Sequence, residues 1–297
     1  MGSSIGLYEH VYLLGVPTMM ATPRLFIINF ENTLFDTNEA IWRSADRTFK
    51  TIYSPRVNIG LDKVFTPREV VNYVRSSDNI KSAFTAMLQK ISPNKPVNAF
   101  MVNAWAVTYK QLYMADGIQY IKPLWCVYEL LKTLKEAKIP TVIFANKLPK
   151  VFVMDIFKRN KMDHLIDEFM IMAETGIRSG GGVPPKPDAG SYKEYGLEMF
   201  SSSSSSSTQR GGGYYGTDDV LVVGDSEDDI RYGKAIGASI CWVSNGYEDR
   251  EQAERCTSLV RAVRRDKWGR DAFIVRHLAE LNTFIERIVN DKAKNVW

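Results

Sequence analysis

The sequence predicts an α/β protein with a doubly wound parallel sheet and an all-helical insertion after the first strand. Apolar runs of strand length recur along the 297 residues, and segments of helical periodicity lie between most of them. Near-continuous apolar runs, without alternation, are typical of strands that helices cover on both faces. Residues 38–120 interrupt this alternation because they show helical periodicity and no convincing strand.

The strands of the sheet are predicted from four strongly apolar runs and one weaker run. They lie at residues 25–29, 140–144, 168–172, 220–223 and, for the weaker run, 239–243. Helices are expected between them and at the C-terminus, at residues 125–134, 151–160, 228–236 and 272–287. In such a sheet, ligands bind at the carboxyl ends of the strands. The polar residues of interest follow three of the strands: Asn29 and Glu31, then Asn146 beside Ala145, and Asp225.

The domain organisation follows from the same pattern. We expect an N-terminal extension at 1–22, an α/β core formed by 23–37 and 121–297, and a helical domain at 38–120. Inside the helical domain, periodicity is clearest at 70–74, 83–90 and 100–113. Residues 201–216 are rich in serine and glycine and predict a flexible insertion within the core.

Composition and charge limit the classes of function. Hydrophobic residues make up 45% of the chain and charged residues 24%, as in ordinary globular proteins, and no apolar run approaches the roughly 20 residues of a membrane span. Three scattered cysteines without a CxxC pair indicate reduced thiols in an intracellular protein, either cytoplasmic or mitochondrial. These features give no signal for a cysteine metal site.

Positive charge is concentrated in two segments. Residues 38–120 contain eleven Lys and Arg against six Asp and Glu, and residues 250–270 contain seven against three. The second segment forms a candidate basic surface that consists of Arg261, Arg264, Arg265, Lys267 and Arg270. Two interpretations stand: contact with RNA or an acidic partner through phosphate-binding side chains, or ordinary solvated faces. Trp42 and Trp268 could stack on bases or pack in a core or interface.

Four short segments carry the strongest functional signal. The first strand ends in Asn29-Phe30-Glu31 and continues to Asn32-Thr33-Leu34-Phe35-Asp36-Thr37, and the second predicted strand ends in Ala145-Asn146-Lys147. Lys186-Pro187-Asp188 follows the third strand, and Gly224-Asp225-Ser226-Glu227-Asp228-Asp229 follows the fourth. These segments resemble the four motifs of the haloacid-dehalogenase (HAD) hydrolase superfamily, in particular its phosphoglycolate-phosphatase-like subgroup. The resemblance covers about residues 25–245 and implies that 38–120 is a helical cap.

The resemblance also implies a role for each motif residue. The HAD nucleophile and magnesium ligand is an aspartate, which here is Asn29, and the general acid/base aspartate is Glu31. The phosphate-binding hydroxyl of the second motif is replaced by Ala145, whereas Asn146 and Lys186 are retained as phosphate-binding candidates. Asp225 and Asp229 are retained at the metal-binding positions. Gly224 is expected to permit a tight turn, and Lys186 to pair with Asp225. Magnesium binding is expected to be weakened, because a carboxylate ligand is lost.

Three hypotheses follow. The first is a catalytically degenerate HAD-fold protein, a pseudo-phosphatase that serves as a binding, scaffold or assembly subunit of a larger complex such as a ribonucleoprotein. The alternative is an active magnesium-dependent phosphatase on a small phosphorylated acid such as phosphoglycolate, in which Glu31 or Asp225 activates water. A third hypothesis keeps phosphate-ester binding without turnover.

Overall fold

The computed structural model describes residues 23–52, 60–77, 79–146, 148–171, 186–194, 219–245, 250–265 and 271–294. The predicted extension at 1–22 lies outside these residues, as does the whole of the serine- and glycine-rich insertion at 201–216. The chain divides into two compact units, one formed by Met1–Leu34 with Pro123–Trp297 and the other by Phe35–Lys122. We call them the core unit and the insert unit.

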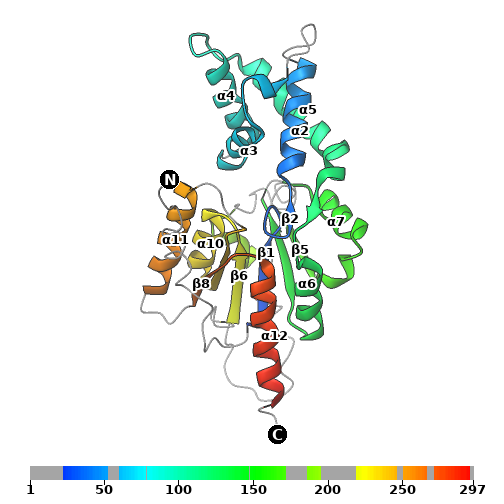
Figure 1. Cartoon of the computed structure of the whole chain (residues 1–297), viewed down its shortest axis with the longest axis vertical. Helices are drawn as coiled ribbons and strands as arrows, with labels where there is room; N and C mark the ends of the chain where they lie inside the picture. The colour runs from blue at the N-terminus through cyan, green and yellow to red at the C-terminus, as the bar shows by residue number, and fades with distance from the viewer. Residues whose placement is uncertain are drawn as a thin grey trace, which may run out of the picture. The chain divides into compact units, whose positions relative to one another are not determined.

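The core unit contains a parallel sheet, as the sequence predicts. Among the described residues, six strands form this sheet in the order β5-β4-β1-β6-β7-β8 (Figure 1). The strands are β1 (Leu25–Asn29), β4 (Thr141–Ala145), β5 (Glu168–Ile171), β6 (Val220–Gly224), β7 (Ser239–Val243) and β8 (Ala272–Val275). Strand β1 pairs in parallel with both β4 and β6. The carboxyl ends of these three strands therefore lie side by side, at the point where the strand order reverses.

The last strand corrects one prediction. Residues 272–287 were expected to form a helix, but Ala272–Val275 form β8 and the helix α12 begins at Leu278 and ends at Lys294. All four residues of β8 are apolar and buried, and the strand pairs with β7. When every residue of a short run is apolar, the hydrophobic pattern has no periodicity, so it does not distinguish a strand from a buried helix. The free edge of β7 decides the outcome, because it offers hydrogen bonds to an extended chain.

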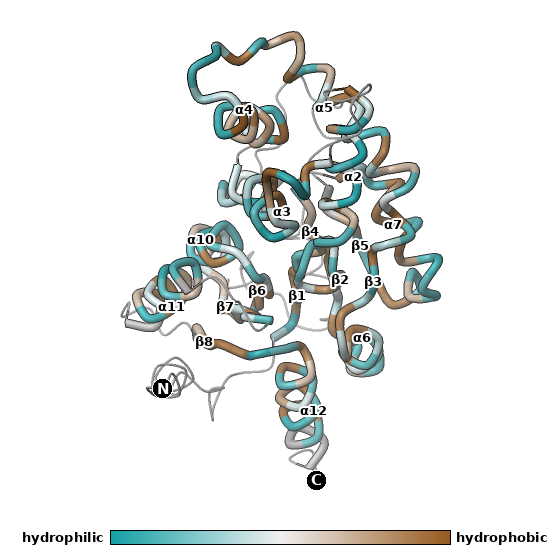
Figure 2. The backbone as a smooth tube through the Cα atoms, turned by 45° about the horizontal axis from the view of Figure 1, so that its top comes forward, coloured by the Kyte–Doolittle hydropathy of each residue, from teal (hydrophilic) through white to brown (hydrophobic). Residues whose placement is uncertain are grey.

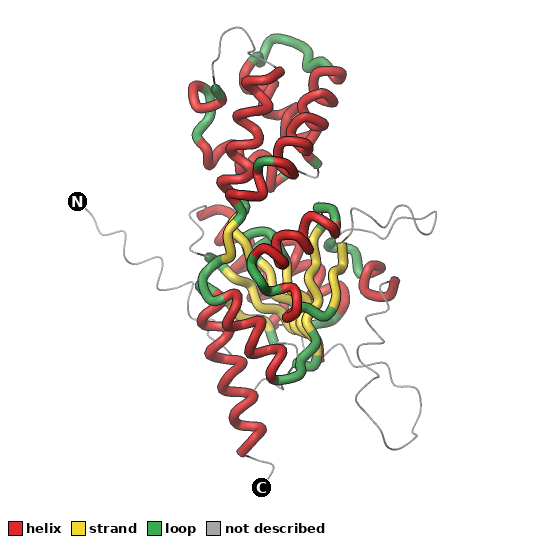
Figure 3. Tube along the Cα trace, turned by 90° about the vertical axis from the view of Figure 1, so that its right-hand side faces the viewer, coloured by secondary structure: helices red, strands yellow, loops and turns green. Residues whose placement is uncertain are grey.

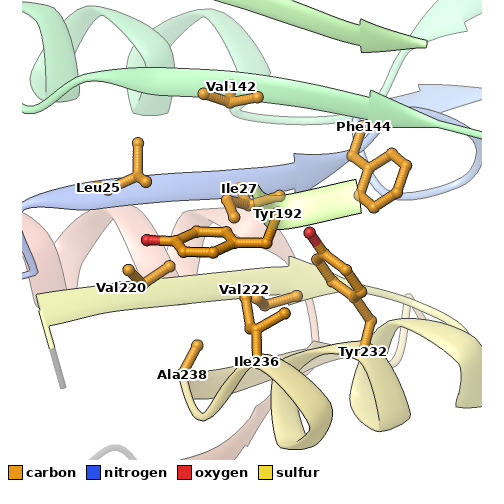
Figure 4. Close-up of a cluster of buried hydrophobic side chains, with 10 residues drawn as sticks. All are labelled: Leu25, Ile27, Val142, Phe144, Tyr192, Val220, Val222, Tyr232, Ile236 and Ala238. Atoms are coloured by element: carbon orange, nitrogen blue, oxygen red, sulfur yellow. The ribbon is translucent and has the colours of Figure 1, made fainter. Parts of the chain in front are cut away.

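Helices cover both faces of the sheet (Figure 3). On one face, a core forms under α10 (Glu227–Ile236) and α8 (Gly190–Glu194). Its buried members come from alternate positions of three strands, from these helices and from the loop after α10, as Figure 4 shows: Leu25, Ile27, Val142, Phe144, Tyr192, Val220, Val222, Tyr232, Ile236 and Ala238. Helix α11 (Arg250–Arg265) extends this layer over β7 and β8. The alternation follows the period of two in a strand.

The opposite face is covered by α6 (Val127–Glu136) and α12, which pack against each other. Phe273 of β8 and Phe284 of α12 meet with their ring centroids 5.6 Å apart. Helix α7 (Lys150–Arg159) packs on β5 through Phe157 and Phe169. Helices α10 and α12 alternate apolar and polar segments along their length, as Figure 2 shows, which is typical of helices with one buried side.

The insert unit is helical, apart from the short strand β2 (Phe35–Asp36) and the first residue of its partner β3 (Lys122–Pro123). Its described α-helices are α2 (Asn38–Ile52), α3 (Pro67–Ser76), α4 (Ile80–Ile91) and α5 (Ala99–Ala115). They pack around Trp105, whose ring contacts Phe49 and Phe84 edge-on at centroid distances of 5.6 and 5.3 Å. The predicted fold class, an α/β sheet with a helical insert after the first strand, is therefore confirmed. Within the described parts of both units, no helix combines the length and hydropathy that crossing a bilayer requires.

Candidate active site

The candidate site lies at the carboxyl ends of β1, β4 and β6, within the core unit. Strand β1 ends at Asn29, and the chain then turns through Asn32, whose φ of 51° lies in the left-handed region that asparagine tolerates. A hydrogen bond from Leu34 N to Phe30 O closes this turn at 3.1 Å. The turn brings Thr33, which is fully buried, back toward the end of the strand.

The side-chain amide of Asn29 is the centre of a hydrogen-bond network. Its Nδ2 contacts three acceptors, namely Asp225 Oδ1 at 3.0 Å, the Glu31 carbonyl at 2.8 Å and Thr33 Oγ1 at 3.2 Å. Its Oδ1 accepts a hydrogen bond of 3.0 Å from Lys186 Nζ. The orientation of the amide follows from chemistry, because an ammonium group only donates and a carboxylate only accepts.

Lys186 forms a buried ion pair with Asp229 rather than the predicted pair with Asp225. Its Nζ lies 2.6 Å from Asp229 Oδ1, and the two side chains are 5% and 2% exposed. The same ammonium lies 4.6 Å from the centre of the Phe144 ring. Removing one member of a buried ion pair costs about 3–5 kcal/mol, because it leaves the other charge uncompensated. The pair therefore ties the segment after β5 to the start of α10.

Asn146, predicted to bind phosphate, holds the backbone of Lys186. Its Oδ1 accepts from Lys186 N at 3.1 Å, and its Nδ2 donates to Lys186 O at 3.4 Å. This double contact fixes the position from which the lysine side chain extends. Both polar groups of the Asn146 side chain are thus engaged by the protein itself.

Asp229 also lies in the first turn of helix α10. Ser226 is the N-cap residue, and the Ser226 and Asp229 side chains each accept a hydrogen bond from the other residue's backbone N–H in a capping box. Asp229 Oδ2 additionally accepts from Ser226 Oγ at 2.6 Å. Both carboxylate oxygens are therefore occupied, one by Lys186 and one by Ser226. The helix dipole favours this negative charge at the N-terminus of α10.

Gly224 leaves space for the Asp229 side chain; it does not supply the backbone conformation of the tight turn that the sequence predicts. Among the described glycines, a positive φ occurs at Gly237 and not at Gly224. A Cβ atom on Gly224 would instead lie 2.2 Å from Asp229 Cγ, well inside contact distance. Asp229 has no room to retreat, because Lys186 and Ser226 hold its two oxygens.

Asp225 is held from several sides. Its Oδ1 accepts from Thr33 Oγ1 at 3.0 Å as well as from Asn29, and its carbonyl accepts from Trp242 Nε1 at 3.0 Å. Sequence reasoning did not give Thr33, Ser226 or Trp242 a role in the site. Ser226 had a detectable signal, since serine three residues before an acid at a helix start predicts a capping box. The contact of Trp242 has no local signal, because it depends on strand pairing.

The remaining predicted residues are placed as follows. Ala145 ends β4 and is 1% exposed, so it offers no hydroxyl where the resemblance expects one. Glu31 is half-buried and contributes its backbone carbonyl to the network. Of the candidate basic surface, Arg261 lies on α11 within the described residues. The Arg264 and Arg265 side chains, with Lys267 and Arg270, lie outside the described part of the chain.

Buried thiols do not replace the missing nucleophile. Burial raises the pKa of the Cys256 thiol to about 12, and it also raises the pKa of Cys241. A thiol reacts as its thiolate, which is scarce for both groups near neutral pH. Neither cysteine therefore supplies a nucleophile to this part of the core unit.

The donor set does not fit the magnesium ion that the resemblance implies. A divalent cation needs oxygen lone pairs, but Asn29 Nδ2 presents hydrogens to Asp225 Oδ1. Rotating the amide would place those hydrogens against the Lys186 ammonium group. Both oxygens of Asp229 are occupied, and no cluster of three or more His, Cys, Asp or Glu suited to a metal occurs among the described residues.

We predict that Asn29→Asp makes stability depend on magnesium. The change adds a second carboxylate about 3.0 Å from Asp225, while Lys186 is already paired with Asp229. Without metal, we expect urea unfolding to show a loss of about 2–3 kcal/mol. Millimolar Mg²⁺ should recover much of this loss, because it binds the folded state.

Asn29→Leu is the matched control, since it removes the amide without adding charge. It should also be destabilised, but its stability should not respond to Mg²⁺. Equal responses of the two variants to the metal, or a strong response of the unaltered chain, would contradict this account of the network.

Gly224→Ala should destabilise the core unit by about 3 kcal/mol, because the new methyl group overlaps Asp229. Urea unfolding of the single variants and of Gly224→Ala/Asp229→Ala forms a double-mutant cycle. If the overlap is the cause, Gly224→Ala should cost much less when Asp229 is already alanine. Additive losses would show that Gly224 matters for another reason.

Comparisons with known proteins agree with this fold. The sequence model of the family described as haloacid dehalogenase-like hydrolase matches residues 26–243. A search of curated proteins finds no significant match. The solved structures that resemble the chain include a predicted phosphoglycolate phosphatase from Haemophilus somnus, with a TM-score of 0.65, 16% identity, and coverage of 90% of this chain and 99% of that one.

Two further structures share the fold. A haloacid dehalogenase-like family hydrolase from Streptococcus pneumoniae has a TM-score of 0.60 and 12% identity over 88% of this chain and 98% of that one. The HAD-hydrolase YfnB from Bacillus subtilis, bound to magnesium, has a TM-score of 0.56 and 13% identity over 89% of this chain and 99% of that one. The family match spans most of the chain and contains all four motifs. The chain therefore belongs to the haloacid dehalogenase-like hydrolase family.

Proposed function

We propose that this chain is a pseudo-phosphatase, a HAD-fold protein that binds or assembles with other molecules and does not perform aspartyl-phosphate chemistry. The observation that carries the proposal is the engagement of Asn29 on both sides, by Lys186 and by Asp225. An amide oxygen is a poor nucleophile, and here it accepts a hydrogen bond from an ammonium group. Loss of a nucleophile typically removes many orders of magnitude in rate.

Two neighbouring positions support the proposal. Ala145 places a methyl group where a phosphate oxygen would need a hydrogen-bond donor. Lys186, the cation that would neutralise a transferring phosphoryl group, is buried and neutralised by Asp229. A phosphate dianion entering this site would have to compete with that carboxylate, which is 2% exposed.

The insert unit supports a role in assembly. Three large apolar side chains of α5, Phe100, Val107 and Met114, are at least 36% exposed and are spaced seven residues apart. This spacing places them on one stripe of the helix. Together with the basic character of residues 38–120, such a stripe favours a protein or ribonucleoprotein partner over a freely solvated insert.

The second candidate function is a magnesium-dependent phosphatase on a small phosphorylated acid. It is favoured by the fold comparison, because the Haemophilus somnus protein is named as a predicted phosphoglycolate phosphatase. It is also favoured by the retention of Asp225, Asp229 and Lys186 at one site. Turnover would require Glu31 or Asp225 to activate water without an aspartate nucleophile, in a site whose donors do not fit the metal.

An activity assay separates the two functions. We expect no hydrolysis of phosphoglycolate or p-nitrophenyl phosphate by the purified chain with Mg²⁺, and none by Asn29→Asp alone, since Glu31 and Ala145 are also altered. The triple variant Asn29→Asp/Glu31→Asp/Ala145→Thr should gain measurable turnover. Adding Lys186→Met to the triple variant is the control and should abolish that gain.

Hydrolysis by the unaltered chain that is lost in Asp225→Ala would overturn the proposal and establish the second function. The assembly role is tested separately, by native purification of the tagged chain with and without ribonuclease. We expect it to migrate far above its 33.7 kDa mass. Migration as a free monomer would contradict the assembly role and leave the catalytic result unaffected.

A further inference from the structure

A pocket in the insert unit has the features of a small-molecule site. It has a volume of about 270 Å³, just below the roughly 300–1,000 Å³ typical of ligand sites. It is formed by α2, by the end of α5 and by the 3₁₀ turn η2 (Gly117–Tyr120). All of its lining residues belong to the insert unit, so the inference does not depend on the site around Asn29.

The floor of the pocket includes a serine hydroxyl. Ser44 lines the pocket and is 3% exposed. A Cβ on the neighbouring Gly117 would lie 3.1 Å from Ser44 Oγ, which is a tight contact. A methyl group at residue 117 would therefore crowd the hydroxyl.

The rim of the pocket carries positive charge. Arg43, Arg47 and Lys50 are spaced by four and three residues along α2, which places them on one side of the helix. Each has an acidic partner: Glu39 for Arg43, Asp116 for Arg47 and Asp46 for Lys50. The Arg43 and Arg47 pairs are largely exposed, and such pairs contribute roughly 0–1 kcal/mol each. Asp46 is only 17% exposed and also accepts a hydrogen bond from Leu61 N at 2.8 Å, so it stays in place. A phosphate can therefore displace the carboxylates of Glu39 and Asp116 at small cost and gain bidentate contacts with arginine.

The walls of the pocket are aromatic. Trp42 and Tyr120 both line the pocket and are half-buried. The Arg43 guanidinium already lies over the Tyr120 ring, 4.6 Å from its centre. A planar ligand could stack on Trp42 or on the outer face of this guanidinium, as bases stack on aromatic and arginine side chains.

We propose that this pocket binds a small molecule that joins a planar ring to a phosphate monoester, of the class of nucleoside monophosphates. The phosphate contacts Arg47 and its basic neighbours, the ring stacks on Trp42 or on the Arg43 guanidinium, and a polar atom of the ligand reaches Ser44. Neither half alone satisfies the pocket, so the combined ligand binds more tightly than its parts.

Isothermal titration of the full chain with adenosine 5′-monophosphate tests this proposal, with adenosine and inorganic phosphate as the separate halves. We expect saturable binding of the monophosphate and at least tenfold weaker binding of each half. Ser44→Ala should weaken binding about fivefold, the equivalent of one hydrogen bond. Arg47→Met should weaken it more and reduce its salt dependence.

Gly117→Ala is the decisive variant, because it fills the pocket floor at a position without positive φ. It should abolish binding while circular dichroism shows an unchanged fold. Lys81→Met, on the exposed surface of α4, is the control and should bind normally. No saturable binding to the folded chain, binding that survives Gly117→Ala, or inorganic phosphate that binds as tightly as the monophosphate would each overturn the proposal.

Discussion

The site of this protein depends on one side chain that hydrogen-bonds opposite charges on its two sides. Asn29 accepts from the ammonium of Lys186 and donates to the carboxylate of Asp225. An aspartate at this position would accept on both sides and face Asp225 as a like charge. Two like charges 3 Å apart repel by about 5 kcal/mol at an effective dielectric constant of about 20, so a nearby cation would be needed. The amide removes that need, and the network is closed by the protein's own groups.

The rest of the core unit holds this network in place. Strands β1, β4 and β6 end beside one another, because β1 is paired in parallel on both sides. Asn146 fixes the backbone of Lys186, the capping box at Ser226 fixes Asp229, and Gly224 leaves the room that Asp229 occupies. These interactions hold the carboxyl ends of the strands, the Lys186 segment and the start of α10 together.

Much of this architecture could be predicted from the sequence, since buried parallel strands have a distinct apolar pattern. Leu25–Asn29 and Ser239–Val243 were located to the residue. The strand Ala272–Val275 was not predicted, because a run of four apolar residues directly before a helix is too short to show the periodicity of a strand. The structure brings the side chains of Asn29, Lys186, Asp225 and Asp229 together, but their pairing could not be foreseen. Whether Lys186 reaches Asp225 or Asp229 depends on distances between segments far apart in the chain. The pocket beside Trp42 could not be predicted from the sequence pattern either, because Ser44 and Gly117 come into contact only through helix packing.

The most direct test of the central claim is a high-resolution crystal structure of the unaltered chain grown with Mn²⁺, which stands in for Mg²⁺ and gives an anomalous signal. We predict hydrogen-bond distances from the Asn29 amide to Asp225 and Lys186, with no anomalous peak beside them. A manganese ion coordinated by Asp225 and the Asn29 oxygen, with Lys186 displaced, would contradict the account.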